Sequence, residues 1–479
     1  MQLASRLGTV ARECPRMVTM MPILWELSRP NLERRGKEKD LGEAARSAQG
    51  LTRKDFLRLG GSALASAYVL GISGCGGSQQ SQGGQVTLRY ANWVASEEAT
   101  RETVAKAIEA FEKQNPNVKV ESVAIPFDQM RQQLVTMAAG GNPPDVMQLS
   151  GPWSQELGAQ GALVDLREIA GEGYLNDNYE GGLEAGEYQG KLYAAPLSLT
   201  PHAFWYNKDL MEQAGLDPEQ PPKTMEELDE QMAQLKAQLP QGTYPIGIDT
   251  TKIDYALVQF WPWFYAFDAR PLYGGEVNFD TPQVGNALQW LRDTVNKGYT
   301  PVGQQIKEER ELMAKDKIVF KLDGPYLVGI LRSLNTNLEG DAFYDKFAVT
   351  TVPVGANGES ETLADIHQIG ISPQAADQNA AWEFAKFLAG SEDSINQYQI
   401  PYGVIPPLKS DQKSDKFNDP VSQVYINDVF ETMNGGPYGP QYGQAQQHII
   451  QALQKAALEN EPIDQILKET EQNLQSVYG

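Results

Sequence analysis

The sequence has 479 residues, and 62 Asp and Glu against 40 Lys and Arg give it a formal net charge of −22. This acidity argues against nucleic acid as a partner, because phosphates attract Lys and Arg, and it favours solubility outside a cell. The length is sufficient for two lobes, each with a sizeable core.

An apolar stretch that ends in a cysteine lies near the start of the chain. Residues 57–72 are mainly apolar behind a basic flank, and Ser73 and Gly74 precede Cys75. The stretch is too short for a membrane-spanning helix, but it has the length of the apolar region of a secretory signal.

This pattern resembles a bacterial lipobox, in which the cysteine is acylated and becomes the first residue of the mature protein. We therefore expect export and a lipid anchor at Cys75, followed by a flexible linker over residues 75–85. The alternative is a structural cysteine after a glycine-rich loop.

The export route stays open between two systems. Residues 52–58 resemble a twin-arginine motif, but Lys54 stands where the second arginine belongs, so general secretion is also possible. Residues 1–50 carry no useful apolar period. We expect translation to begin near Leu51 and residues 1–74 to hold the leader and signal peptide.

The chain has few cysteines and histidines that could bind a metal. Cys14 would be lost with the leader and Cys75 modified, so we expect no disulfide and no thiol chemistry. The histidines are far apart, without the Cys/His spacing of a zinc site: His202, His367 and His448. We expect no metal and no cofactor.

Strands alternate with helices after residue 85. Residues 86–90 alternate in polarity, and Val104, Ile108 and Phe111 fall on one face of a helix. The predicted elements are a strand over 86–90, a helix over 97–114, a strand over 118–123, a helix over 127–139 and a strand over 145–149. This order predicts an α/β fold with a mainly parallel sheet.

The pattern restarts after Pro196, and Thr224 is a typical helix N-cap. The predicted strands are 204–207, 246–248, 317–321, 347–352 and 369–372. The predicted helices are 208–214, 224–239, 282–297, 326–334, 379–389, 421–433, 444–458 and 463–477.

Several segments, in order and spacing, resemble one family. They are FEKQNPNVKV at 111–120, AAGGNPPDV at 138–146, YNKDL at 206–210, AGL at 214–216, PKTMEEL at 222–228 and DGPY at 323–326. They are similar to motifs of the extracellular solute-binding proteins of ABC transporters. The sugar-binding group typified by maltose-binding protein is the most similar.

The resemblance implies a two-lobed periplasmic-binding-protein fold with three hinge crossings and a ligand cleft between the lobes. Lobe one would be 86–198 plus 368–402, and lobe two 199–367 plus 403–479. The lobes would close on the solute, and a monomer would deliver it to the subunits of a membrane permease.

A sugar site needs aromatic planes for ring faces and polar groups for hydroxyls. Trp93 follows the first strand at its carboxyl end, where open α/β sheets bind ligands, although inter-lobe packing is the alternative. Trp153 falls in a loop that contacts sugar in the family. One of Trp261 and Trp263 is expected to face the cleft.

The polar candidates lie near the crossings. His202 is close to the first crossing, and Asp365 and His367 fall where lobe two crosses back. Asp323 either accepts from ligand hydroxyls or caps the following helix. Tyr326 occupies the position of the family's stacking tryptophan and adds a hydroxyl.

Tyr402 and Tyr438 complete the candidates because they lie in Pro/Gly-rich loops, a common setting for aromatic contacts. Asp145, Tyr206 and Asn207 are interpreted as structural.

We found no Lys/Arg cluster near the crossings, which favours a neutral saccharide over an anionic solute. Two other functions remain open. An exported glycoside hydrolase would need a defined carboxylate pair, and a sensor would present its ligand to a receptor on the same fold. The sequence carries no Walker segment, no HExxH and no GxSxG.

Overall fold

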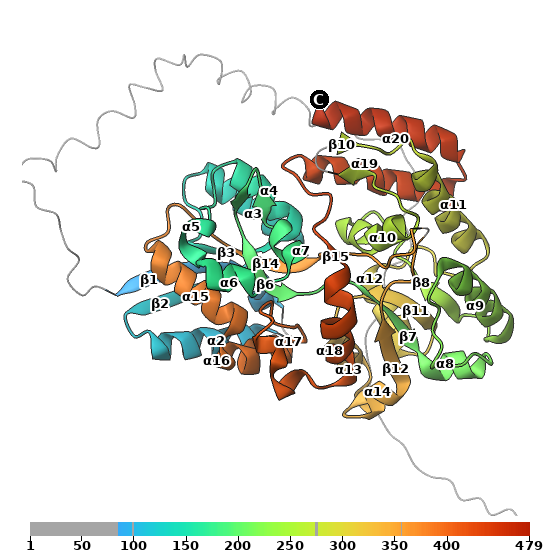
Figure 1. The fold of residues 1–479 in the computed structure, drawn as a ribbon, viewed down its shortest axis with the longest axis horizontal. Coiled ribbons are helices and arrows are strands. Elements are labelled where there is room, and N and C mark those ends of the chain that lie inside the picture. The colour runs from blue at the N-terminus through green and yellow to red at the C-terminus, as the bar shows by residue number, and fades with distance from the viewer. Residues whose placement is uncertain (1–84, 98–99, 274–275, 356) are drawn as a thin grey trace, which may run out of the picture. The chain divides into compact units, whose positions relative to one another are not determined.

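The computed structural model describes residues 85–97, 100–273, 276–355 and 357–479. The predicted leader, Cys75 and most of the linker lie outside the described residues. The strands of the described part form two main sheets, each with its own covering helices (Figure 1).

The first sheet has five strands in the order β2-β1-β3-β14-β6. Their bounds are β1 Val86–Asn92, β2 Val118–Ala124, β3 Val146–Ser150, β6 Ala195–Leu199 and β14 Ile366–Ile371. Helices α2 Arg101–Gln114, α4 Gly151–Ala159, α7 Glu180–Glu184 and α15 Gln378–Gly390 pack against these strands.

The prediction of a mainly parallel sheet is right for β1, β2 and β3 and wrong for the other two strands. β1 runs parallel to β2 and β3, whereas β14 runs antiparallel to both β3 and β6. The reason is the path of the chain. β6 leads out toward the second sheet and β14 returns from it, so the two strands run in opposite directions.

The second sheet has four strands in the order β12-β7-β11-β8. Their bounds are β7 Ala203–Asn207, β8 Tyr244–Gly247, β11 Ile318–Asp323 and β12 Phe347–Thr350. Helices α8 Lys208–Gln213, α9 Met225–Gln238, α12 Ile306–Ala314, α14 Ala342–Lys346 and α18 Pro420–Val424 pack against them. The predicted cap is confirmed, because the Thr224 hydroxyl accepts from the Glu227 N–H at 3.1 Å.

The remaining helical segments complete the two groups. Beside the first sheet they are η1 Val94–Ser96, α3 Phe127–Ala139, α5 Arg167–Ala170, α6 Glu172–Asn176, α16 Glu392–Ser394, the π-helix Ile395–Gln399 and α17 Ile400–Tyr402. Later segments are α10 Asp254–Ala266, α11 Pro282–Asn296, α13 Leu327–Leu334, α19 Tyr442–Gln454, α20 Ile463–Tyr478, the π-helices Tyr425–Val429 and Lys455–Glu459, and short 3-10 turns at Thr336–Leu338, Asp411–Lys413, Asp415–Phe417 and Phe430–Thr432.

Three two-stranded pairs are β4 Glu187–Tyr188 with β5 Lys191–Leu192, β9 Leu272–Tyr273 with β10 Glu276–Val277, and β13 Thr362–Leu363 with β15 Met433–Asn434. Among the described residues, none of the helices has the length and apolar character needed to span a membrane.

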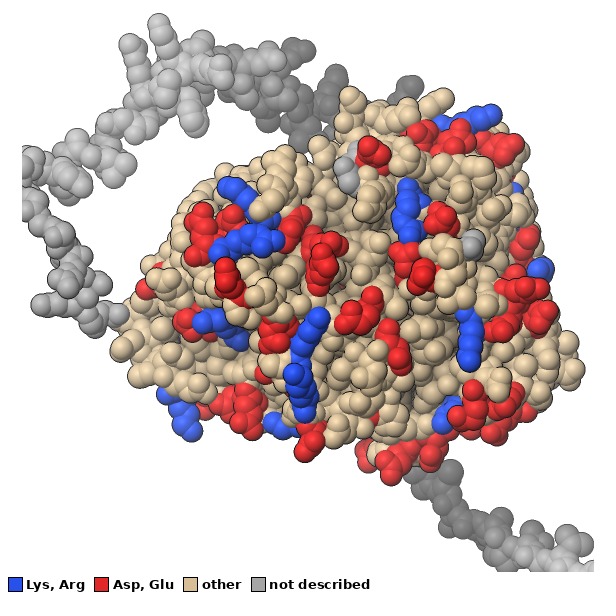
Figure 2. All heavy atoms as spheres, viewed as in Figure 1, with Lys and Arg blue, Asp and Glu red and all other residues tan. Residues whose placement is uncertain are grey.

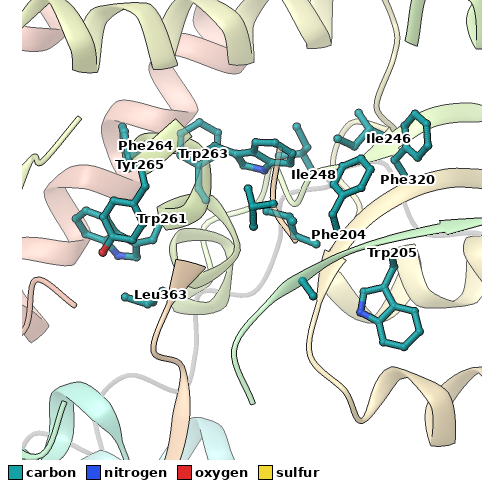
Figure 3. Packing of buried hydrophobic residues seen from close by; sticks show 14 of the residues in the cluster. Phe204, Trp205, Ile246, Ile248, Trp261, Trp263, Phe264, Tyr265, Phe320 and Leu363 are labelled. Atoms are coloured by element: carbon teal, nitrogen blue, oxygen red, sulfur yellow. The ribbon is translucent and has the colours of Figure 1, made fainter. Parts of the chain in front are cut away.

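Each sheet has a separate hydrophobic core. In the second core, Phe204 of β7 packs against Phe320 of β11 at 5.1 Å and edge-on against Trp263 of α10 at 6.4 Å (Figure 3). The chain passes from one sheet to the other three times: after β6, before β14 and after Tyr398. Tyr398 itself belongs to the first core. Two of these passages touch, because Leu199 forms an antiparallel bridge with Ile405. The exact lobe boundaries stay a prediction.

Candidate functional site

Aromatic side chains gather where the parallel strands of the first sheet end. Trp93 follows β1, Phe127 opens the helix after β2, and Trp153 lies in the first turn of the helix after β3. Carboxyl ends of parallel strands meet at one edge of a sheet. The three residues therefore lie together: the Trp93 ring centroid is 5.3 Å from that of Phe127 and 5.9 Å from that of Trp153. Phe127 is 41% exposed, so this group of rings reaches the surface.

His367 and Tyr402 extend the same group. The His367 ring lies edge-on to Trp93 at 5.0 Å and stacks on Tyr402 at 5.7 Å. The Trp93 indole N–H donates to the Tyr402 hydroxyl at 3.4 Å. Burial lowers the pKa of His367 to about 3, so its ring is neutral. We call Trp93, Phe127, Trp153, His367 and Tyr402 the aromatic cluster.

A second group is polar and belongs to the other sheet. Asp323 ends β11, and the Arg310 guanidinium of α12 donates to both of its oxygens, at 2.7 and 2.8 Å. The Gly324 N–H donates to the same carboxylate at 2.9 Å. Burial alone would raise the pKa of Asp323, but Arg310 outweighs burial and holds it below its usual value. Asp323 is thus an ionised carboxylate that is already paired.

Two tyrosines and a histidine form a hydrogen-bonded chain beside this pair. The hydroxyls of Tyr326 and Tyr255 lie 2.5 Å apart, and the Tyr255 hydroxyl lies 2.8 Å from His202 Nε2. The Arg310 guanidinium lies over both tyrosine rings, at 5.2 Å from Tyr326 and 5.9 Å from Tyr255. Burial lowers the pKa of His202 to about 4, so the imidazole is neutral at pH 7. We call Asp323, Arg310, Tyr326, Tyr255, His202 and Asp365 the polar cluster.

Asp365 connects the two clusters. It immediately precedes β14, two residues before His367, and its carboxylate lies 3.9 Å from His202 Nε2. The Thr200 hydroxyl donates to its main-chain carbonyl at 2.7 Å, which ties two of the passages together. Burial and the nearby charge of Asp323 raise the pKa of Asp365 to about 7. Within the described residues no side chain donates a hydrogen bond to its carboxylate.

The third passage also contacts the polar cluster. Gly403 has φ +77°, and a Cβ there would lie 3.2 Å from the Tyr326 Cα. A side chain at residue 403 would therefore be strained and would press on Tyr326. The glycine allows Tyr402 of the aromatic cluster to lie close to Tyr326 of the polar cluster.

Comparison with known proteins places the chain in a family. The model of a family described as bacterial extracellular solute-binding protein matches residues 95–394, well over half of the chain. The chain belongs to the bacterial extracellular solute-binding proteins. The resemblance found in the sequence motifs is thereby confirmed, and the family consists of binding proteins rather than enzymes.

The individual similarities are distant. A protein of Brucella abortus named as a binding protein is 23% identical over 413 residues, covering 84% of this chain and 96% of that protein. UgpB of Escherichia coli, an sn-glycerol-3-phosphate-binding periplasmic protein, is 28% identical over 180 residues, 36% of this chain and 40% of UgpB. The structure of the sugar-binding protein MalE from Xanthomonas citri matches with TM-score 0.71 and 22% identity, covering 82% of this chain and 97% of MalE. This match shows the two-lobed fold.

Most of the predicted site residues of this solute-binding protein come together. The aromatic cluster contains Trp93, Trp153, His367 and Tyr402. The polar cluster contains His202, Asp323, Tyr326 and Asp365. Tyr438 lies beside them, because its ring packs against Gly151, the first residue of the helix that carries Trp153.

The two tryptophans of α10 do not join the clusters. Trp263 packs against Trp290 at 4.9 Å, and the Trp261 indole N–H donates to the Tyr442 hydroxyl at 2.8 Å (Figure 3). Both side chains have no exposed surface and belong to the second hydrophobic core. The expectation that one of them faces the cleft is wrong, since the second half of α10, Phe260 to Ala266, is apolar and buried on every side.

The residues interpreted as structural have structural contacts. The Asp145 carboxylate accepts from the N–H groups of Arg89 at 2.8 Å and Ala376 at 2.6 Å. The Asn207 side chain caps α8 by accepting from the Leu210 N–H at 3.1 Å.

Three residues of the clusters were missed by the sequence analysis. Phe127 could have been found, because it follows a predicted strand of the same parallel sheet. Tyr255 and Arg310 carry no local signal. Arg310 is one charge in a mixed run on α12 and reaches Asp323 only through the fold.

The raised pKa of Asp365 predicts a pH dependence of stability. The folded protein holds this proton up to about pH 7, whereas the unfolded chain loses it near pH 4, so the stabilisation is present below pH 4 and is lost as the pH rises through 7. Relative to wild type, Asp365→Asn should therefore gain roughly 1–3 kcal/mol in the free energy of unfolding between pH 5 and 8. Urea unfolding of both proteins across this range measures the difference.

The difference in the free energy of unfolding between wild type and Asp365→Asn reports on the titration of Asp365. The lowered pKa of His202 acts in the opposite direction, because its stabilisation is lost as the pH falls from 6.5 to 4. That contribution is common to wild type and variant to a first approximation. A wild-type-minus-variant difference that does not change with pH would contradict the buried, unpaired carboxylate.

Proposed function

We propose that this protein is held by a lipid anchor outside the cell, captures a neutral sugar or short oligosaccharide between its lobes, and delivers it to an ABC permease. The observation that carries the proposal is the pairing of an aromatic cluster with a polar cluster at the passages between the two sheets. Rings supply flat apolar area for the C–H face of a sugar. Asp365 and the hydroxyl of Tyr326 supply hydrogen bonds for its edge.

The electrostatics support an uncharged solute. The polar cluster contains one cation, Arg310, and both oxygens of Asp323 already bind it. His202 of the polar cluster and His367 of the aromatic cluster are neutral at pH 7 because burial lowers their pKa values. An anionic solute would meet Asp365 without a free positive partner. The structurally similar MalE of Xanthomonas citri is a sugar-binding protein, which agrees with this proposal.

A thermal-shift panel tests the solute class. Neutral mono- and oligosaccharides should raise the melting temperature, since a ligand at a hundred times its Kd adds about 2.7 kcal/mol. UgpB makes glycerol 3-phosphate the essential counter-sample. A panel in which only glycerol 3-phosphate or other anions stabilise the protein would contradict the neutral-sugar proposal.

We also propose that the protein does not catalyse. Glycoside hydrolysis needs one carboxylate free to attack or to activate water and another to donate a proton. Asp323 is engaged by Arg310 and Gly324, which leaves Asp365 as the free carboxylate of the polar cluster. Turnover of any sugar of the panel by purified protein would overturn this part.

The anchor gives a separate prediction. Cys75→Ser should move the protein from the membrane fraction to the soluble fraction of the producing cells, because acyl chains supply the membrane affinity. Fractionation and intact-mass analysis measure this, with Cys14→Ser as the matched control. A Cys75→Ser protein that stays in the membrane fraction would contradict lipid anchoring while leaving the solute proposal intact.

The acidic surface agrees with an extracytoplasmic protein that binds no nucleic acid. Asp and Glu outnumber Lys and Arg over the face seen in Figure 2, and the two signs are interspersed rather than gathered into a basic patch. A sensor that presents the same ligand to a receptor is the second candidate. Loss of sugar uptake on deletion of the gene would favour transport.

A further inference from the structure

We propose that Tyr326 presents a hydrogen-bond donor to the solute, because the buried hydrogen-bond chain behind it runs outward from His202 through Tyr255. This rests on the proposed function and deepens it. It requires that the solute place an acceptor oxygen, such as a ring, glycosidic or hydroxyl oxygen, against Tyr326. The Asp365 side chain then accepts a hydrogen bond from a hydroxyl of the same solute.

Two short hydrogen bonds connect buried His202 to Tyr326 through Tyr255. His202 Nε2, the Tyr255 hydroxyl and the Tyr326 hydroxyl are joined by contacts of 2.8 and 2.5 Å. Among the described residues, the hydrogen-bond partners of the Tyr255 hydroxyl are His202 Nε2 and the Tyr326 hydroxyl. His202 is almost fully buried, while Tyr326 is partly exposed and forms the open end of the chain. Any direction imposed at His202 is therefore passed on to Tyr326.

Three protons are shared among the three groups. Burial keeps His202 neutral with a pKa of about 4 and raises the pKa values of Tyr255 and Tyr326, so each group carries one hydrogen. If Nε2 is protonated, it donates to Tyr255, Tyr255 donates to Tyr326, and the Tyr326 O–H is free. If Nδ1 is protonated, Tyr326 donates to Tyr255, Tyr255 donates to Nε2, and Tyr326 offers only lone pairs.

A mixed arrangement is disfavoured by the short contact. If Tyr255 donated to Nε2 while Tyr326 pointed its hydrogen at the solute, no hydrogen would lie between two oxygens 2.5 Å apart. Two oxygen atoms at that distance repel unless one donates to the other. In the other mixed arrangement Tyr255 would accept from both His202 and Tyr326, and its own O–H would have no acceptor among the described residues. The hydrogen bonds from His202 to Tyr326 therefore all point in one direction or all in the other.

The surroundings of His202 decide the direction. Its Nδ1 is buried and has no hydrogen-bond partner among the described residues. A buried N–H without an acceptor is rarer and costlier than a bare acceptor nitrogen. The Asp365 carboxyl group lies 3.9 Å from Nε2, and its ionised form, which prevails above about pH 7, also favours a hydrogen there. Both observations favour the Nε2–H tautomer, which leaves the Tyr326 O–H free.

The other charged groups around the chain agree with this state. Arg310 lies over both tyrosine rings and is neutralised by Asp323. Lys321 lies two positions before Asp323 in β11, on the same face of the strand, and its charge is paired with Glu309. Burial and the negative charge of Asp323 outweigh Arg310 at the Tyr326 hydroxyl and hold its pKa above the usual value. The Tyr326 hydroxyl therefore keeps its hydrogen and can donate it.

Nitrogen-15 NMR of the histidine rings tests the direction without a ligand. An unprotonated ring nitrogen resonates far downfield of a protonated one, and a His202→Gln protein identifies which of the three histidine signals belongs to residue 202. At pH 7 we expect Nε2 protonated and Nδ1 bare. In Tyr255→Phe, which removes the hydroxyl and little else, the preference should weaken. A protonated Nδ1 in the wild-type protein would overturn the proposal.

Calorimetry with the sugar that most stabilises the protein tests the consequence. Tyr326→Phe keeps the ring and removes the donor, so affinity should fall about 5–10-fold, the equivalent of one neutral hydrogen bond. Unchanged affinity in Tyr326→Phe would overturn the donor role. If His202 shows the Nε2–H tautomer but no sugar binds, the proposed function fails and the direction of the chain stands.

Discussion

Trp93→Ala is expected to lower the affinity for the solute by at least about 30-fold, the loss typical of a central aromatic anchor. Trp93 touches every other ring of the aromatic cluster except that of Tyr402, whose hydroxyl it binds. Its removal leaves Phe127, Trp153 and His367 without their common neighbour. Calorimetric titration of the best sugar of the panel measures the loss.

The substitution will also destabilise the fold, so it needs a matched control. Trp93 is only 2% exposed, and replacing a buried tryptophan with alanine costs about 3–5 kcal/mol. Trp382 of α15 is 3% exposed and packs edge-on against Tyr174, in the same core but outside the cluster. Trp382→Ala should lose similar stability and keep its affinity. Equal affinity losses in the two variants would mean that Trp93 acts through stability alone.

Lys321→Met is expected to lower the free energy of unfolding by about 3–5 kcal/mol, because it leaves a buried carboxylate without its cation. Lys321 on β11 forms an ion pair with Glu309 on α12, and neither side chain has any exposed surface. Removing the lysine leaves a buried carboxylate with the Gln259 amide as its side-chain donor, at 3.2 Å. Urea unfolding at pH 7 measures the change.

Two companion variants separate the buried charge from the lost volume. Lys321→Met combined with Glu309→Gln removes both charges and should recover much of the stability. Lys315→Met breaks an exposed i,i+4 pair with Glu311 and should cost less than about 0.5 kcal/mol. If Lys321→Met costs no more than Lys315→Met, the pair is not buried as described.

Local sequence signals predicted the elements well where the pattern was amphipathic. The helix expected over 127–139 is α3, Phe127–Ala139, and the helix expected over 282–297 is α11, Pro282–Asn296. α10 was missed because its second half is apolar on all sides and contains Pro262, so that half has neither an amphipathic period nor a high helix propensity. The strand expected over 369–372 overlaps β14, Ile366–Ile371, but its antiparallel direction was not predicted, because strand direction depends on the path between lobes and not on local sequence.

The candidate site divides in the same way. Trp93 and Trp153 were predicted because they follow strands of a parallel sheet, where the ligand edge is set by topology. Arg310 and Tyr255 were not predicted, because α10 and α12 bring them to Asp323 and His202 only in three dimensions. The failure to predict Arg310 affected the predicted site, because Arg310 pairs with Asp323 and leaves Asp365 as the carboxyl group that can bind the solute.

Diffraction from crystals grown with the neutral sugar that most raises the melting temperature tests the central claim most directly. We expect a sugar ring within contact distance, about 4–4.5 Å, of Trp93 or Trp153. A sugar hydroxyl should donate to Asp365, and a sugar oxygen should accept from Tyr326. A sugar bound elsewhere, or an anion held by Arg310 after displacing Asp323, would contradict the account.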